Sequence, residues 1–253
     1  MIDIHSHILP GLDDGSHSMK ESVAMLRIAA QSGTTDIVAT PHANLEYTFD
    51  EDKITEKIAK LREKVGPEPR IHRGCDFHLS FDNIEDAVES PTKYTINHHN
   101  YLLVEFSDYL IFNNTGEIFD HLLAGGMTPI ITHPERNYLL HQRMKDLDVW
   151  ADKGVLLQVT ALSFLGRFGR AAKRFAETLM QKGMVDFVAS DAHDPEDRTP
   201  DMAGAYEFIS HQYGEEWAWR LFVSNPRHTL TGEPIQRAIA EPPVRKRWYK
   251  FWG

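Results

Sequence analysis

The chain begins with residues 1–7, MIDIHSH, in which apolar and polar residues alternate from Ile2 to His5 and two histidines stand two positions apart. An alternation with a period of two is typical of a β-strand. Because every second side chain of a strand lies on the same face, His5 and His7 are expected to point into one space. Ile2 and Ile4 would then point toward the surrounding helices. This stretch predicts a first strand that ends at a pair of candidate metal ligands.

Six more short apolar, β-branched runs follow, and stretches with helical spacing separate most of them. The seven expected strands span residues 1–5, 36–40, 70–75, 101–106, 128–133, 155–160 and 185–190. Strands that alternate with helices favour parallel pairing through right-handed crossovers. Seven such units predict an α/β fold whose strands form a closed or nearly closed β/α barrel, with an open doubly wound sheet as the alternative. A barrel of this kind carries its functional groups at the C-terminal ends of its strands.

Metal-capable side chains stand at the ends of six of the seven expected strands. In chain order they are His5 and His7, His42, Asp76, Glu105, His133, and Asp191 with His193. The sixth strand, which ends at residues 158–160, offers none. Burying several carboxylates and imidazoles together without cations would cost many kcal/mol. The pattern therefore predicts a metal centre, which would remove that cost.

The types of donor narrow the choice of metal. Imidazole and carboxylate without thiolate suit Mn²⁺, Fe²⁺ or Zn²⁺ rather than Cu(I) or an iron–sulfur cluster. The donors are too many for one ion, so two or three ions that share a bridging carboxylate are expected. Such a centre favours metal-assisted hydrolysis, in which a water that bridges two ions becomes hydroxide near neutral pH and attacks a phosphoryl group.

The composition excludes other classes of protein. The 253 residues are 42% hydrophobic and 25% charged, as in ordinary globular proteins. A net charge of −10 argues against nucleic acid as a partner, because phosphate contacts need clustered Lys and Arg.

The single cysteine, Cys75, indicates a reducing, cytoplasmic compartment. Neither a membrane span nor a secretory leader is expected. Phe81 stands where a cysteine-dependent phosphatase needs Arg, so we interpret Cys75 as a buried structural residue.

Six short motifs, in this order along the chain, resemble the polymerase-and-histidinol-phosphatase (PHP) superfamily: DIHSH at 3–7, LDDG at 12–15, TPH at 40–42, VEF at 104–106, HPER at 133–136 and SDAH at 190–193. Within it the chain is most similar to the bacterial protein-tyrosine phosphatases of capsule and exopolysaccharide clusters. The resemblance spans about residues 1–230. It implies a distorted (β/α)7 barrel of the PHP type that carries a trinuclear site at the C-terminal ends of the strands.

The resemblance also implies which residues bind the metals. The first ion would be held by His5, His7, Asp76 and Asp191, the second by Asp76, Glu105 and His133, and the third by Asp14, His42 and His193. Arg136 and Arg198 match the family's phosphate-binding arginines, whose planar donor forks suit phosphoryl oxygens. Several relatives have Glu at the position of Asp76, so a bridge there requires a strand end closer to the metals. Mn²⁺ is the expected ion, with iron and Zn²⁺ as alternatives.

The donor pattern predicts metal-assisted hydrolysis of a phosphomonoester, and the resemblance implies that the substrate is a tyrosine-phosphorylated protein. The resemblance implies that this partner is a bacterial tyrosine autokinase of capsule or exopolysaccharide production, tethered to the inner membrane. One alternative is a phosphatase for small phosphomonoesters such as histidinol phosphate or a sugar phosphate. Another is an inactive module that binds metal and docks a kinase.

The expected phosphatase domain, residues 1–241, ends at two prolines, and a tail of residues 242–253 follows. The tail segment 244–252, VRKRWYKFW, has four cations and four aromatic residues. It is interpreted either as an aromatic strap that packs over one end of the barrel or as a weak anchor for an anionic membrane surface. Residues 206–209 and 217–219 are interpreted as subunit interfaces of a homo-oligomer or as helices that cover the barrel.

Overall fold

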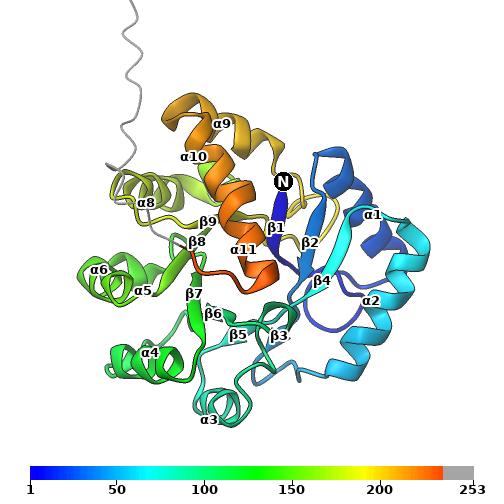
Figure 1. The fold of residues 1–253 in the computed structure, drawn as a ribbon. Helices are drawn as coiled ribbons and strands as arrows, with labels where there is room; N and C mark the ends of the chain where they lie inside the picture. The colour runs from blue at the N-terminus through cyan, green and yellow to red at the C-terminus, as the bar shows by residue number, and fades with distance from the viewer. Residues whose placement is uncertain (236–253) are drawn as a thin grey trace, which may run out of the picture.

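The computed structural model describes residues 1–235, and the strands in this part of the chain form two parallel sheets. The strands are β1 (Ile2–Ser6), β2 (Asp36–Ala39), β3 (His42–Ala43), β4 (Arg70–Arg73), β5 (Asp76–His78), β6 (Tyr101–Glu105), β7 (Thr128–Thr132), β8 (Leu156–Thr160) and β9 (Phe187–Ala189). One sheet has the order β1-β2-β4, and the other has the order β3-β5-β6-β7-β8-β9. Together they confirm the predicted α/β fold with parallel strands (Figure 1).

Hydrogen bonds at both seams join the two sheets into a distorted ring. The chain passes from β2 to β3 and from β4 to β5, and the Asp76 amide donates to the Pro41 carbonyl across this seam, with an N···O distance of 3.2 Å. At the other seam the Asp191 amide donates to the His5 carbonyl at 2.9 Å, and the His7 amide donates to the Ala192 carbonyl at 2.8 Å. The end of β9 therefore returns to β1.

Two of the seven expected strands differ from the prediction, because residues 36–40 and 70–75 each form only the first part of a broken strand. Pro41 has no amide hydrogen for the ladder, so β2 ends before it and β3 begins after it. Gly74 lies between β4 and β5, where an added Cβ would come within 2.8 Å of Val38 Cγ1. The break places the first residues of β3 and β5, His42 and Asp76, opposite each other.

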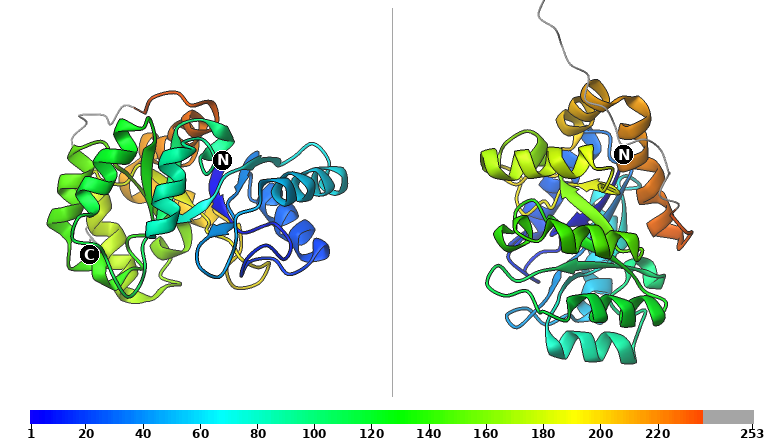
Figure 2. Two further views of the ribbon diagram at one scale, coloured as in Figure 1. Left: turned by 90° about the horizontal axis from the view of Figure 1, so that it is seen from below. Right: turned by 90° about the vertical axis from the view of Figure 1, so that its left-hand side faces the viewer.

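Helices surround the strands, and most connect one strand to the next. They are α1 (Met19–Gln31), α2 (Glu51–Val65), α3 (Phe81–Glu89), α4 (Thr115–Ala124), α5 (Tyr138–His141), α6 (Met144–Asp152), α7 (Ala161–Phe164), α8 (Gly169–Gln181), α9 (Ala203–Tyr213), α10 (Glu215–Trp219) and α11 (Asn225–Thr231), with a 3₁₀ turn at Ile96–His98 and a π turn at Arg220–Ser224. In Figure 2 (left) the blue N-terminal units, with α1 and α2, stand on one side of the strands and the green helices stand on the other.

Local sequence signals explain where several helices begin and end. The side chains of Ser18, Asp50 and Ser80 each accept a hydrogen bond from a backbone amide three residues later, at the starts of α1, α2 and α3. Such caps satisfy amides that have no partner within the helix. Helix α2 ends at Gly66, whose φ of 83° is a conformation that glycine adopts without strain.

The interior of the barrel contains two isoleucines that we expected on its outside. Ile2 and Ile4 pack in one buried cluster with Tyr101, Leu103 and Ile130, on the face of the strands that also carries the candidate ligands. The cause is an extra residue in β1: Asp3 pairs with Ile37, but Ser6 rather than residue 5 pairs with Ala39. A bulge of this kind places consecutive residues on the same face. The prediction for Ile2 and Ile4 is therefore wrong.

The C-terminal helices cover the barrel. Tyr206 and Phe208 of α9 and Trp217 of α10 pack against the largest buried cluster, as the interpretation of covering helices requires. Among residues 1–235, no helix combines the length and the apolar character that crossing a membrane requires. The expected domain boundary at residue 241 and the basic, aromatic tail of residues 242–253 lie outside the described residues.

Candidate metal centre

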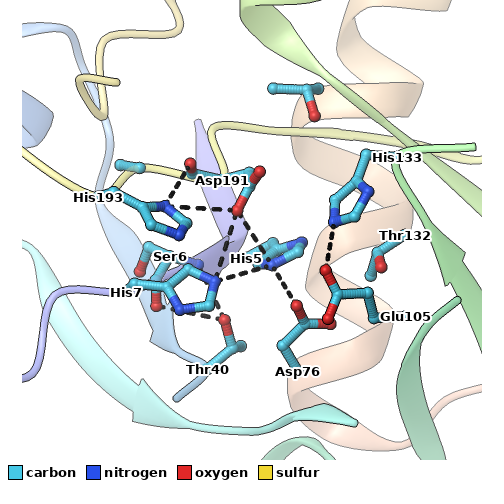
Figure 3. Close-up of polar contacts among 12 residues, drawn as sticks. His5, Ser6, His7, Thr40, Asp76, Glu105, Thr132, His133, Asp191 and His193 are labelled. Carbon is cyan, nitrogen blue, oxygen red and sulfur yellow. Dashed lines mark hydrogen bonds and ion pairs between the residues drawn. The ribbon is translucent and has the colours of Figure 1, made fainter. Parts of the chain in front are cut away.

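The candidate ligands that follow different strands lie in one place at the C-terminal ends of the barrel strands. Figure 3 shows His5, His7 and Asp191 on one side of a common centre and Asp76, Glu105 and His133 on the other. Most of these side chains are buried, and Glu105 is 22% exposed. Parallel strands bring residues together in this way because all their carboxyl ends lie on one side of the barrel.

His5 lies at the middle of the first group of ligand atoms. Its Nε2 is 3.2 Å from His7 Nε2, 3.3 Å from Asp191 Oδ1 and 3.4 Å from Asp76 Oδ2. Asp191 Oδ1 is also 3.4 Å from His7 Nε2. These are the four residues that the family resemblance assigns to the first ion.

Asp14 lies at the centre of a second group. Its Oδ1 is 3.2 Å from His42 Nε2 and 3.4 Å from His193 Nε2. His7 joins these three residues, and one ligand atom of each of the four lies within 4.8 Å of the others. This group contains the three residues assigned to the third ion, with His7 shared between the two groups.

The remaining ligand atoms are grouped differently from the sets that the resemblance implies. His42 Nδ1 lies 3.4 Å from Asp76 Oδ2 and 3.6 Å from Glu105 Oε2, so His42 lies between two groups. His133 groups with His5 and Asp191, while its Nε2 is 3.7 Å from Glu105 Oε1. The groups overlap through His5, His7, His42 and Asp76, so the donors form one connected set.

Asp76 shows that the site fits cations. The residue is fully buried, and neither of its carboxylate oxygens has a hydrogen-bond partner among the described residues. The Nδ1 atom of His42, which faces Asp76, is also buried without one. His5 Nε2 and His42 Nδ1 each lie 3.4 Å from Oδ2, and coordination to divalent ions would satisfy both oxygens. The donor set, imidazole and carboxylate, is one that such ions prefer.

The pKa directions of two of the ligands, Asp191 and His133, suit cation binding. Burial opposes ionisation of Asp191, but the charges of His5, Arg136 and Arg198 hold its pKa well below the usual range. Burial and the neighbouring Arg136 lower the pKa of His133 to about 3, so its ring is neutral at pH 7. The carboxylate is therefore charged, and the imidazole keeps a lone pair free for a metal.

Two buried polar residues that the sequence did not reveal orient the histidines. Gln158 Oε1 lies 3.0 Å from His5 Nδ1, and Asp13 Oδ2 lies 2.7 Å from His7 Nδ1. Each contact occupies one ring nitrogen and turns the other, Nε2, toward the centre, as residues behind metal ligands generally do. Gln158 is on the sixth predicted strand, which therefore supports the site without supplying a ligand. For Asp13, the sequence signal was its position beside Asp14 in the LDDG motif.

Gly15 brings the loop after β1 against His7. A Cβ at this position would lie 2.3 Å from the His7 carbonyl oxygen and 2.4 Å from its Cβ. We expect Gly15→Ala to lower the free energy of unfolding by about 2 kcal/mol, because overpacking forces the backbone to shift. It should also weaken metal binding, measured by titration with Mn²⁺. The matched control is Gly116→Ala in α4, where the nearest atom would be 3.4 Å away; equal stability of the two variants would contradict the prediction.

Both predicted phosphate-binding arginines contact the candidate ligand Asp191. Arg198 Nη2 donates to Asp191 Oδ2 at 2.6 Å, and Arg136 Nη1 donates to the same oxygen. The Arg136 guanidinium also stacks on the Phe168 ring, with Cζ 4.4 Å from the ring centroid. The two cations are thus held at the edge of the metal centre.

Glu135 is a further buried residue for which the sequence suggested no role. Its Oε1 accepts hydrogen bonds from the Thr160 amide at 2.9 Å and from the Ser163 hydroxyl at 2.7 Å. These bonds tie the segment that carries His133 and Arg136 to the end of β8 and to α7. The HPER motif indicated this segment, but it did not indicate that Glu135 anchors it.

Two further residues, Cys75 and His78, lie near the site. Cys75 is fully buried, which confirms the structural interpretation, and burial raises the pKa of its thiol well above the usual value. His78 is a further histidine at the end of β5, and it is only partly buried. Its Nδ1 lies 3.6 Å from Glu105 Oε2, so it borders the metal centre.

The comparisons with known proteins agree with this geometry. A family model for capsular polysaccharide synthesis proteins, CpsB/CapC, matches residues 1–231. The chain belongs to this family. It is 32% identical to the tyrosine-protein phosphatase CpsB of Streptococcus pneumoniae, over 93% of this chain and all of that protein. It is 29% identical to the tyrosine-protein phosphatase YwqE of Bacillus subtilis, over the full length of both chains.

A solved structure gives the same result for the fold. The chain superposes with a TM-score of 0.87 and 29% identity on a structure from a study of YwqE and CpsB, described as metal-dependent tyrosine phosphatases. The match covers 98% of this chain and 100% of the other. The described residues of this CpsB/CapC member therefore have the family fold.

Proposed function

We propose that this CpsB/CapC protein is a metal-dependent protein-tyrosine phosphatase. The observation that carries the proposal is the convergence of nine histidine and carboxylate side chains, with two arginines at their edge, in a chain whose full-length relatives are named tyrosine phosphatases. The individual roles of these side chains are part of the proposal.

The nine proposed ligands are His5, His7, Asp14, His42, Asp76, Glu105, His133, Asp191 and His193. These side chains would hold divalent ions, which would supply a nucleophile at neutral pH and charge neutralisation for the phosphoryl oxygens. Asp76 is proposed as the shared ligand of the site, because its Oδ2 lies 3.4 Å from both His5 Nε2 and His42 Nδ1. We propose two or three ions, with Mn²⁺ as the native metal and iron or Zn²⁺ as alternatives.

Arg136 and Arg198 are proposed to bind the phosphoryl oxygens that face away from the metals. A guanidinium offers two parallel N–H donors to a phosphate, and both residues are anchored at Asp191. They would orient the phosphate and stabilise the charge that develops as the ester bond breaks.

Replacing Arg136 with Lys tests this role. Arg136→Lys keeps the charge but loses the donor fork and the stacking on Phe168, so we expect kcat/KM for a phosphotyrosine peptide to fall about a hundredfold. The matched control is Arg143→Lys before α6, where the arginine pairs with Asp146 and lies outside the metal centre. An Arg136→Lys enzyme with rates within about twofold of the parent would argue against phosphate binding by Arg136.

The proposed substrate is a tyrosine-phosphorylated protein, specifically a membrane-associated bacterial tyrosine autokinase of capsule or exopolysaccharide synthesis. The family's role in capsular polysaccharide synthesis supports this partner. We propose that the enzyme works in the cytoplasm, and that the tail of residues 242–253, which is outside the described residues, contacts the anionic inner surface of the membrane. We also propose that the protein forms a homo-oligomer, and its molecular mass in solution would test this.

A comparison of substrates tests the function. The metal-loaded protein should release phosphate from a tyrosine-phosphorylated kinase tail with a much higher kcat/KM than from histidinol phosphate. The reverse preference would indicate a phosphatase for small molecules. The absence of turnover of any phosphomonoester would indicate a metal-binding docking module, provided that metal analysis shows full occupancy.

A further inference from the structure

A cavity of about 110 Å³ adjoins the candidate metal centre between the loops that follow β6 and β7. Glu105, His133 and Arg136 line it from the side of the metal centre, and Asp108 and Asn137 also form part of its wall. The cavity thus connects the proposed phosphate-binding groups with two surface loops. A phosphate bound near Arg136 would have the rest of its substrate at this opening.

The two loops are fixed to each other at the cavity. The side chain of Asn137 donates hydrogen bonds to the Ser107 carbonyl at 3.1 Å and to Asp108 Oδ1 at 3.4 Å. The Oδ1 atom of Asn137 also accepts from the Leu140 amide at 3.0 Å and so caps α5. One buried side chain therefore holds both loops in a defined position.

The residues next to these anchors present large apolar surfaces to solvent. Tyr109 and Leu110 directly follow Asp108 and are 94% and 60% exposed, and Tyr138 directly follows Asn137 and is 73% exposed. Single exposed apolar residues are common and need no explanation. Here three exposed apolar residues directly follow two residues of the cavity wall, on loops that are hydrogen-bonded to each other. We call them the apolar lip (Tyr109, Leu110 and Tyr138).

We infer that the apolar lip binds the residues flanking the phosphotyrosine in an extended segment of the substrate protein. This inference rests on the proposed function. With the phosphate at Arg136, the peptide backbone on either side of the tyrosine must pass the opening of the cavity. Tyrosine side chains offer large contact area with little loss of conformational freedom, which suits recognition of apolar neighbours. A small phosphomonoester ends before it reaches the lip, so the lip would select peptides over metabolites.

The double variant Tyr109→Ser/Tyr138→Ser tests the inference. We measure kcat/KM for a phosphotyrosine peptide with apolar residues on both sides and for phenyl phosphate. The ratio of the two values should fall about tenfold or more, through a higher KM for the peptide. The variant Tyr109→Phe/Tyr138→Phe keeps the rings and should keep the ratio. The matched control Val149→Ser removes an apolar residue that is 53% exposed on α6, and it should also leave the ratio unchanged.

The outcomes separate the lip from the proposed function. An unchanged ratio in the double serine variant, or an equal loss on both substrates, overturns the lip inference while the phosphatase activity stands. If the unmodified, metal-loaded protein hydrolyses neither substrate, the proposed function fails and the lip inference fails with it. Thermal unfolding of each variant confirms that the fold is intact, as expected for side chains this exposed.

Discussion

Hydrolysis of phosphotyrosine is expected to fall more than about a thousandfold when a strong chelator removes all metal, and to return when Mn²⁺ is added. The physical reason is that Asp76, Asp191 and the buried histidines form a site suited to cations, and Asp76 has no other hydrogen-bond partner for its oxygens among the described residues. The measurement is the rate of phosphate release as a function of free Mn²⁺. Added metal should also raise the melting temperature, because it binds the folded state.

Alkylation of thiols provides the control for this experiment. Cys75 is fully buried and its pKa is raised by burial, so alkylating reagents should leave the activity of the folded protein nearly unchanged. Full activity in excess chelator would reject the metal mechanism. Loss of activity on alkylation, with the fold intact, would point to cysteine chemistry instead.

The second large effect is expected for Asp76→Asn, which should lower kcat by about a thousandfold. The substitution keeps the size of the side chain but removes the charge that the ions need and places an amide among His5 and His42. Metal content, measured by elemental analysis, should fall by at least one ion per chain. Asp76→Glu keeps the charge but adds a methylene group in a fully buried position, so we expect an intermediate loss of about tenfold.

Asp36→Asn is the matched control for Asp76. Asp36 is also a buried strand aspartate, but it lies at the start of β2, where Arg70 and His72 hold its carboxylate. The variant should lose stability, by about 1–3 kcal/mol, because the ion pairs are removed. It should keep its metal content and kcat. A loss of kcat in Asp36→Asn as large as that in Asp76→Asn would show that the effect reports folding rather than the site.

Much of the fold could be predicted from the sequence because each strand carries its signal locally. All seven predicted strand regions contain strands, and the residues at their ends converge as the barrel geometry requires. Pro41 and Gly74 are residue types that can interrupt a strand. Whether the strand breaks at Gly74 depends on its close approach to Val38, which the sequence does not show. No local sequence pattern predicts the bulge in β1, which turns Ile4 inward, because the bulge arises from the pairing of β1 with β2.

By itself, the sequence determined the number and order of the βα units and the chemistry of the side chains at their ends, since both follow from local pattern and residue type. Only the tertiary structure decided which ligands share an ion-sized space, and that His42 faces both Asp14 and Asp76. It also decided that Gln158 orients His5 and that Asn137 joins two loops at the cavity. These relations depend on register and packing between segments distant in the chain, and no local pattern encodes such distances.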